Sequence, residues 1–279
     1  EENPWGPLHV ERGFGAETST VTVCGAEGPH NINDHISSAA PGILTTIATT
    51  MAGMGSNNAY AFGEPILALG PEHAVILARD GMSKDDIRAY EDDGVVCLRQ
   101  MFDREWVDRM REASLRYMES GVGDHRVREA KIPGESARFY INSFMSVYDR
   151  EFLDFRNQSP AAEIGATLMG VGRVRFWYDQ MFVKDAGTSA PTQWHHDLPF
   201  WPFLGEHLVS IWVALTPATK RTGRLEYMAG SHKWGKFYCP VTPDEDAAFT
   251  DPELEPCPNF TEHHDDPTLR FLSWDVEAG

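Results

Sequence analysis

The chain has 279 residues, 42% of them hydrophobic, and carries a formal net charge of −18 from 24 basic and 42 acidic side chains. The acidic balance argues against nucleic acids and anionic membranes as partners, because both require basic patches. No apolar run reaches the roughly 18 residues that a transmembrane helix needs. The composition therefore predicts a soluble protein, with one large domain and an appendage or two modest domains, and leaves the substrate open.

The first 82 residues differ in character from the rest. Residues 41–55 are rich in Gly, Ala, Thr and Met, whereas clear helix and strand signals begin only at Ser83. The early segment resembles part of the UGSC-like group of small bacterial domains, but it lacks the cysteine motif of that group. We therefore predict an N-terminal extension or fused domain remnant over residues 1–82, of unassigned fold, and a main domain over residues 83–279.

The main domain is predicted to open with a short helix and a strand. Ser83 and Asp86 have the spacing of a capping box, which marks the start of a helix. Gly94 is suited to the turn that follows that helix. Residues 95–101 are then predicted to form a strand.

Two further helices are predicted downstream. Asp103 is placed to cap a helix that stops at Gly121 and has one apolar face. Another helix is expected after Pro160, where the missing N–H of proline does no harm. The helix, strand and helix that begin at Ser83 would form a support layer against one wall of a β structure.

Two apolar segments are typical of core strands. Residues 173–184 are rich in aromatic side chains, and residues 208–215 carry apolar side chains on both faces of the predicted strand. The sequence therefore predicts a sheet that is buried at its centre.

A triplet of residues, His195-His196-Asp197, lies between these strands. In an extended strand, residues i and i+2 point to the same face, so His195 and Asp197 would share a face and His196 would point away. One imidazole and one carboxylate are two of the three ligands in the 2-His-1-carboxylate arrangement that holds non-haem Fe(II). A single short motif also arises by chance, and a solvated surface loop is the alternative interpretation.

The order of motifs around the triplet resembles the phytanoyl-CoA dioxygenase family of Fe(II)- and 2-oxoglutarate-dependent oxygenases. The resemblance begins near Ser83 and continues to the end of the chain. It implies a mainly β fold with flanking helices, built on a double-stranded β-helix (jelly-roll) core that is C-terminally incomplete. The matching features are, in order, the strand ending in Lys184, Trp194-His195-x-Asp197, the strand carrying Trp212, Gly223, and Gly230-Ser231-His232.

The same resemblance implies roles for individual residues. His195 and Asp197 would be iron ligands, and Trp212 would lie beside 2-oxoglutarate, with plain core packing as the alternative for Trp212. Lys184 is a second candidate for contact with the cofactor, with surface solvation or an ion pair as its alternative. Candidates for the substrate mouth, or else for packing of the wall, are Trp194, Phe200 and Trp201.

The second iron histidine and the arginine that clamps 2-oxoglutarate follow, in the family, a Gly-Asp turn after a strand. Residues 270–279 resemble that strand, and the sequence stops at the turn. Because the chain also begins without methionine, we expect a fragment of a longer reading frame, with the third ligand after Gly279. Among internal histidines, His232 resembles a structural turn, and His263 and His264 lie in an acidic loop.

The resemblance predicts an enzyme that hydroxylates a C–H bond of a small metabolite with O2 as co-substrate and releases succinate and CO2. Ascorbate is a candidate reductant. A small polar metabolite is expected rather than a CoA thioester, because the acidic chain does not favour a polyanion. The four cysteines are widely spaced and form no CxxC pair, which indicates free thiols and a cytoplasmic location.

Other readings of the chain stay open. The first is a non-catalytic or metal-free jelly-roll protein that binds a ligand or a partner. The second is a cupin-type metal enzyme, although the closely spaced histidine pair with a later Glu and His is absent. A chain that truly ended at Gly279 would favour a relic or binding fold.

Overall fold

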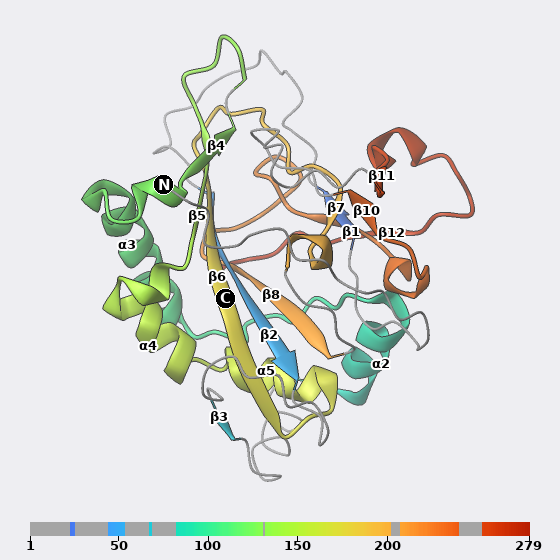
Figure 1. Ribbon diagram of the computed structural model, residues 1–279, viewed down its shortest axis with the longest axis horizontal. Helices are drawn as coiled ribbons and strands as arrows, with labels where there is room; N and C mark the ends of the chain where they lie inside the picture. The colour runs from blue at the N-terminus through green and yellow to red at the C-terminus, as the bar shows by residue number, and fades with distance from the viewer. Residues whose placement is uncertain are drawn as a thin grey trace.

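The computed structural model describes the backbone of residues 23–25, 44–53 and 67–68, and residues 82–130, 132–201, 207–239 and 253–279 with their side chains. Within these ranges the chain is mainly β with flanking helices, as predicted. Figure 1 shows a central sheet with helices beside and below it, and a group of shorter strands to one side.

The two predicted core strands are β6 (Arg173–Lys184) and β8 (Leu208–Ala214). Both belong to the larger sheet, but they are not neighbours in it. The strand β2 lies between them and is antiparallel to both, in the order β4-β5-β6-β2-β8, while β3 pairs with the beginning of β6. The sheet therefore draws strands from both sides of residue 82, although most of residues 1–82 lie outside the described part. The strands are β2 (Leu44–Gly53), β3 (Leu67–Ala68), β4 (Arg128–Ala130), β5 (Phe139–Ser143), β6 (Arg173–Lys184) and β8 (Leu208–Ala214).

The smaller sheet is antiparallel throughout and has the order β12-β9-β1-β7. A separate parallel pair joins β10 to β11. Two antiparallel sheets suit a jelly roll, whose closure stays a prediction. The strands are β1 (Val23–Gly25), β7 (His195–His196), β9 (Glu226–Met228), β10 (Tyr238–Cys239), β11 (Glu255–Pro256) and β12 (Phe271–Ser273).

The helices begin and end at the residues that cap them. The predicted capping box of Ser83 and Asp86 is present in α2, which ends at Gly94 in the left-handed conformation. Asp103 caps α3, whose end is Gly121. The helices are α2 (Lys84–Asp93), α3 (Arg104–Ser120), α4 (Arg150–Gln158) and α5 (Ala161–Met169), with short 3-10 turns η1 (Asp124–Arg126), η2 (Met145–Val147), η3 (Leu198–Phe200), η4 (Ser231–Lys233) and η6 (Phe260–His263).

The main core lies between the helices and one face of the larger sheet. Apolar side chains of all four helices form one buried cluster with side chains of β5, β6 and β8. Burial of this apolar surface supplies the chief driving force for folding. A functional site is therefore expected on the opposite face of the larger sheet. The buried sheet residues in this cluster are Tyr140 of β5, together with Val174, Met181, Val183, Val209 and Val213.

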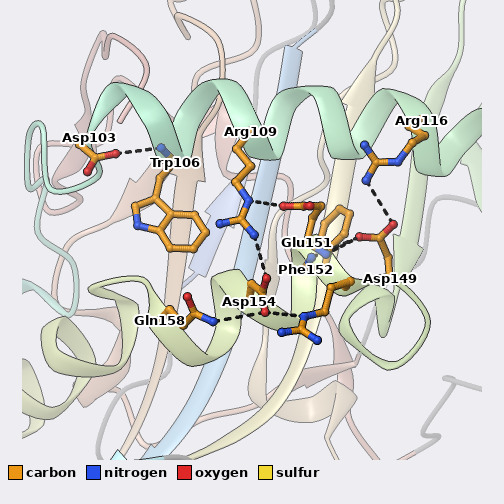
Figure 2. Close-up of polar contacts among 10 residues, drawn as sticks. Asp103, Trp106, Arg109, Arg116, Asp149, Glu151, Phe152, Asp154 and Gln158 are labelled. Carbon is orange, nitrogen blue, oxygen red and sulfur yellow. Dashed lines mark hydrogen bonds and ion pairs between the residues drawn. The ribbon is translucent and has the colours of Figure 1, made fainter.

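Charged side chains fasten α4 to α3 (Figure 2). Arg109 of α3 reaches both Glu151 and, at 2.8 Å, Asp154 of α4. Arg150 and Gln158 also donate hydrogen bonds to Asp154, whose side chain is only 14% exposed. Because several partners share one partly buried carboxylate, the network orients α4 better than an isolated surface pair could.

The prediction of a strand over residues 95–101 is wrong. These residues pair with no strand, and Gln100 has φ 56°, which interrupts an extended backbone. Val96, Leu98 and Met101 instead pack their side chains against the main core. The apolar residues of this segment suggested a strand, because an irregular segment that packs on the core can have the same composition as a buried strand.

Two smaller predictions concern cysteines and membranes. Cys97, Cys239 and Cys257 form no disulfide bond within the described part of the chain. Among the helices of the described ranges, none combines the length and the apolar character that crossing a membrane requires.

Candidate metal and substrate site

His195 and Asp197 converge at the end of β7. His195 Nε2 lies 3.3 Å from Asp197 Oδ1. The strand itself ends at His196, and Asp197 has already turned into the helical region with φ −69° and ψ −41°. The expected meeting of the two side chains is therefore present, although Asp197 lies in the turn that follows the strand.

Neighbouring groups orient both side chains. His195 Nδ1 is 2.6 Å from the carbonyl oxygen of Gln193, which can only accept, so Nδ1 carries a proton and Nε2 faces Asp197. The Ser210 hydroxyl donates to Asp197 Oδ2 over 2.8 Å. Burial works to raise the pKa of Asp197, but the neighbouring His195 ring and the hydrogen bond from Ser210 lower it below its ordinary value. The carboxylate is therefore ionised at neutral pH, as a metal ligand must be.

The pair fits two of the protein ligands of a facial iron site. An imidazole nitrogen and a carboxylate oxygen point at each other, and each is held by an outer partner, as in metal sites generally. In the part of the chain that the structure describes, no group of three or more His, Cys, Asp or Glu side chains is gathered. The third ligand stays a prediction.

His196 lies on the opposite face of the smaller sheet and is 2% exposed. Its ring packs against Tyr238 and Phe237, and neither ring nitrogen has a hydrogen-bond partner among the described residues. Burial lowers the pKa of His196 to about 4. It is thus a neutral core histidine.

The other candidate histidines lie away from the pair. His232 is buried, and its Nε2 is 3.0 Å from the carbonyl oxygen of Glu91, consistent with a structural turn. His264 pairs with Glu226 and stacks on Phe271. Tyr227 and Leu272 are in register with His195 across β1 and therefore share its face of the smaller sheet. Glu226 and Phe271 are the next residues along their strands, so they lie on the face opposite to His195.

The two predicted cofactor contacts lie in different places. Trp212 shares a face of β8 with Ser210 and is opposite Ala48 of β2, whereas Lys184 is opposite Leu44. They are therefore about 13 Å apart along the strand direction. Lys184 Nζ donates to the carbonyl oxygen of Ala190 over 3.0 Å, and burial lowers its pKa to about 8. Trp212 and Lys184 lie on the same face of the sheet, but only Trp212 is close along the strands to Ser210 and its partner Asp197.

The three aromatic residues predicted at the substrate mouth separate into two groups. The ring of Phe200 lies edge-on to His195 with 5.9 Å between centroids. Trp201 donates from Nε1 to the hydroxyl of Tyr178 over 3.3 Å. Trp194 is 6% exposed, bonds Thr261 and packs on the far face of the sheet, so it belongs to the wall.

Several residues near the site were missed by sequence reasoning. Ser210 interrupts an apolar strand with a single hydroxyl, and Tyr178 and Gln180 alternate along β6; both signals were available. Thr50 of β2 is opposite Tyr178 on one side and Ser210 on the other. Directly opposed residues point to the same face, so Tyr178 lies on the side of the sheet that carries Ser210 and its partner Asp197.

Comparisons with known proteins identify relatives of the chain. The family model of phytanoyl-CoA dioxygenase (PhyH) matches residues 90–279. Among curated proteins, dioxygenase hkm4 of Aspergillus hancockii is 25% identical over 164 residues, which cover 52% of each chain. The chain thus spans about half the length of this curated relative. No solved structure matches the chain.

Proposed function

Because the chain belongs to the phytanoyl-CoA dioxygenase family, we propose that it is an Fe(II)- and 2-oxoglutarate-dependent dioxygenase that hydroxylates a C–H bond of a small metabolite. The observation that supports this most is the approach of His195 Nε2 to Asp197 Oδ1 at 3.3 Å. Bound Fe(II) with 2-oxoglutarate and O2 would supply the oxidising power, with succinate and CO2 as by-products and ascorbate as a candidate reductant.

The residues of the chain have distinct tasks in this proposal. His195 and Asp197 hold the metal through Nε2 and a carboxylate oxygen. Gln193 and Ser210 fix the orientation of these two ligands. Phe200 shields the imidazole from water on one side, and Trp212 forms part of the wall beside 2-oxoglutarate.

Metal titration of single variants tests the proposal. In the complete protein, His195→Ala and Asp197→Ala should each abolish Fe(II) binding, whereas His196→Ala should bind Fe(II) almost as the unchanged protein does. Anaerobic titration with Fe(II), with thermal unfolding as a check on folding, measures this. Equal loss of Fe(II) binding in all three variants would contradict the prediction that His195 and His196 point to opposite faces of β7.

The same protein can be tested for turnover. Succinate formation should require both Fe(II) and 2-oxoglutarate and should be absent in Asp197→Ala. A protein that binds no Fe(II) and forms no succinate would instead be the alternative predicted from the sequence, a metal-free or non-catalytic jelly-roll protein that binds a ligand or a partner.

A further inference from the structure

An exposed apolar turn follows β5. Phe144, Val147 and Tyr148 are 37%, 65% and 53% exposed, which is unusual for three large side chains in one turn. Phe144 also has φ 63°, a left-handed conformation that bulky residues seldom adopt. Such an outlier persists only where its surroundings enforce it, and it often marks a functional position.

Buried and charged groups hold this turn in place. The N–H of Phe144 donates to the carbonyl oxygen of Asp179 over 2.8 Å, and the N–H of Ser146 donates to Asp179 Oδ2 over 3.0 Å. Arg126 donates to the carbonyl oxygen of Ser143 over 2.8 Å, and its guanidinium lies 4.3 Å from the ring centre of Tyr148. The turn is therefore fixed by its neighbours, and Phe144 is presented outward in one orientation.

Phe144 is the outer member of a row of aromatic rings. Its ring centre is 5.6 Å from that of Tyr178, which in turn is 6.4 Å from that of Trp201 in an edge-to-face arrangement. We call Phe144, Tyr178 and Trp201 the aromatic lip. Asp197 and Trp201 cap the two ends of the short turn η3, so the lip adjoins the segment that carries the candidate ligands.

A chain of uncharged hydrogen bonds runs along the lip. Trp201 Nε1 donates to the Tyr178 hydroxyl, which donates to Gln180 Oε1 over 2.9 Å, and Gln180 Nε2 donates to Ser143 Oγ over 3.3 Å. Ser143 Oγ accepts in this chain, and no acceptor among the described residues takes its own hydroxyl hydrogen. This chain of hydrogen bonds therefore ends at the hydroxyl of Ser143, which is an uncharged donor.

The lip and the candidate iron ligands face the same space. Tyr178 and Ser210 are both opposite Thr50, two strands apart, which places their backbones about 10 Å from each other. Ser210 bonds Asp197 directly. A ligand held by the lip would therefore lie on the face of the sheet that carries Ser210 and its partner Asp197.

We propose that the substrate carries an aromatic ring, bound by the aromatic lip, and an uncharged oxygen acceptor that takes the hydroxyl hydrogen of Ser143. Aromatic faces and edges favour another ring. The Arg126 guanidinium beside the turn already contacts the Ser143 carbonyl oxygen, His125 and the Tyr117 hydroxyl, so the group offered to a ligand is the uncharged Ser143 hydroxyl, which favours a neutral acceptor over an anion. This inference rests on the proposed function for its reaction, and it narrows the small polar metabolite expected from sequence to one with a ring.

Binding of simple probes to the metal-free chain tests this inference separately from catalysis. N-acetyl-L-phenylalaninamide has a ring and neutral carbonyl acceptors. N-acetyl-L-leucinamide lacks the ring, and phenylacetate replaces the neutral acceptor by an anion. Calorimetric titration should show saturable binding of the first probe, with at least about fivefold weaker binding of the other two.

Variants of the turn and of a distant aromatic residue complete the test. Phe144→Ala should weaken binding of the aromatic probe about fivefold or more, and Phe144→Gly should do the same while accepting φ 63° without strain. Trp234→Ala, which removes an aromatic ring of similar exposure (39%) elsewhere, is the control and should leave binding unchanged.

The outcomes separate the lip from the metal site. Equal binding of the ring-free probe, an effect of Trp234→Ala as large as that of Phe144→Ala, or no saturable binding of the aromatic probe would overturn the inference. Fe(II) binding by the Phe144 variants should equal that of the unchanged protein. If the protein binds the aromatic probe as expected but binds no Fe(II), the inference about the aromatic lip is supported and the proposed dioxygenase reaction is contradicted.

Discussion

At the scale of single residues, Asp179 is the most unusual group outside the candidate metal site. It is 3% exposed on β6, and burial raises its pKa to about 6 although a hydrogen bond from Ser146 opposes the change. A carboxyl group whose pKa is higher in the folded than in the unfolded chain stabilises the fold only when it is protonated. Its contribution is therefore complete below its ordinary pKa of 3.8 and is lost as the pH rises through 6.

Asp179→Asn removes this dependence on pH. The amide oxygen can still accept from the N–H of Ser146, so the turn at Phe144 should be kept. The variant should gain stability over the unchanged protein between about pH 4 and pH 6, by up to about 3 kcal/mol at neutral pH. Chemical denaturation of both proteins at a series of pH values measures the difference.

The comparison isolates Asp179 from the other buried groups. His196 has the opposite effect, because its pKa is lowered to about 4 and its contribution is lost as the pH falls. His196 is present in both proteins, so its effect cancels in the difference. A difference that does not change with pH would mean that Asp179 is ionised in the fold at all these pH values.

Residue-scale prediction from sequence succeeded where the interaction is local. His195 and Asp197 are two positions apart in the sequence, and the triplet pattern was enough to predict that they meet, although Asp197 lies in the turn after the strand and not in the strand as expected. The contacts of Phe144 with Asp179 and Tyr178 join residues of separate elements. No local signal marks such pairs, and for that reason the aromatic lip was not predicted.

At the scale of elements, the end of α2 is built around the Gly-Ser-His turn. Gly94 ends the helix with φ 77°, and the N–H of Gly230 donates to the carbonyl oxygen of Asp93 over 2.8 Å. A Cβ atom at Gly94 would lie 2.3 Å from His232 Nδ1, far inside van der Waals contact. Position 94 therefore requires glycine for two reasons, the backbone conformation and the space taken by the histidine ring.

Two glycine substitutions separate these reasons. Gly170 ends α5 with φ 63°, and a Cβ atom added there would meet nothing within 4 Å, so Gly170→Ala should cost only the backbone strain, about 1 kcal/mol. Gly94→Ala should cost about 1–3 kcal/mol more, because His232 must also move. Urea denaturation of both variants gives the two costs, and equal values would mean that the His232 ring shifts freely.

The starts of helices with capping residues were predicted correctly from the sequence, but the pairing of strands was not. The caps at Ser83 and Asp103 gave the starts of α2 and α3 because a cap is a contact within one turn. The insertion of β2 between β6 and β8 has no counterpart in the local pattern of residues 44–53. Strand order depends on contacts between distant segments, and a single sequence gives little information about them.

At the scale of the whole molecule, β2 is an interior strand of the larger sheet. Its backbone pairs with β6 over its full length and with β8 over Thr46 to Ala52 (Figure 1). A residue in the middle of such a strand has its N–H engaged on one side or the other. The larger sheet is thereby predicted to depend on a segment that lies before residue 82.

Ile47→Pro tests this dependence. Ile47 is opposite Met181 and Val213, and proline would remove its N–H from the ladder. A lost hydrogen bond with an unsatisfied buried partner costs about 1–3 kcal/mol, so the Tm should fall by several degrees, at roughly 2–4 °C per kcal/mol. The control is Arg128→Pro in the edge strand β4, which should lower the Tm less. A larger fall in the control would show that β2 adds little to the sheet.

The place of β2 also sets the order in which the chain can fold. The strand leaves the ribosome early, but its two neighbours begin only at Arg173 and Leu208. It must therefore wait for most of the chain to be made, and folding dominated by contacts between distant segments is slow. During that delay β2 lacks both of its partner strands and presents two unpaired edges to other chains, which favours aggregation. Refolding should therefore yield more native protein at low protein concentration than at high concentration.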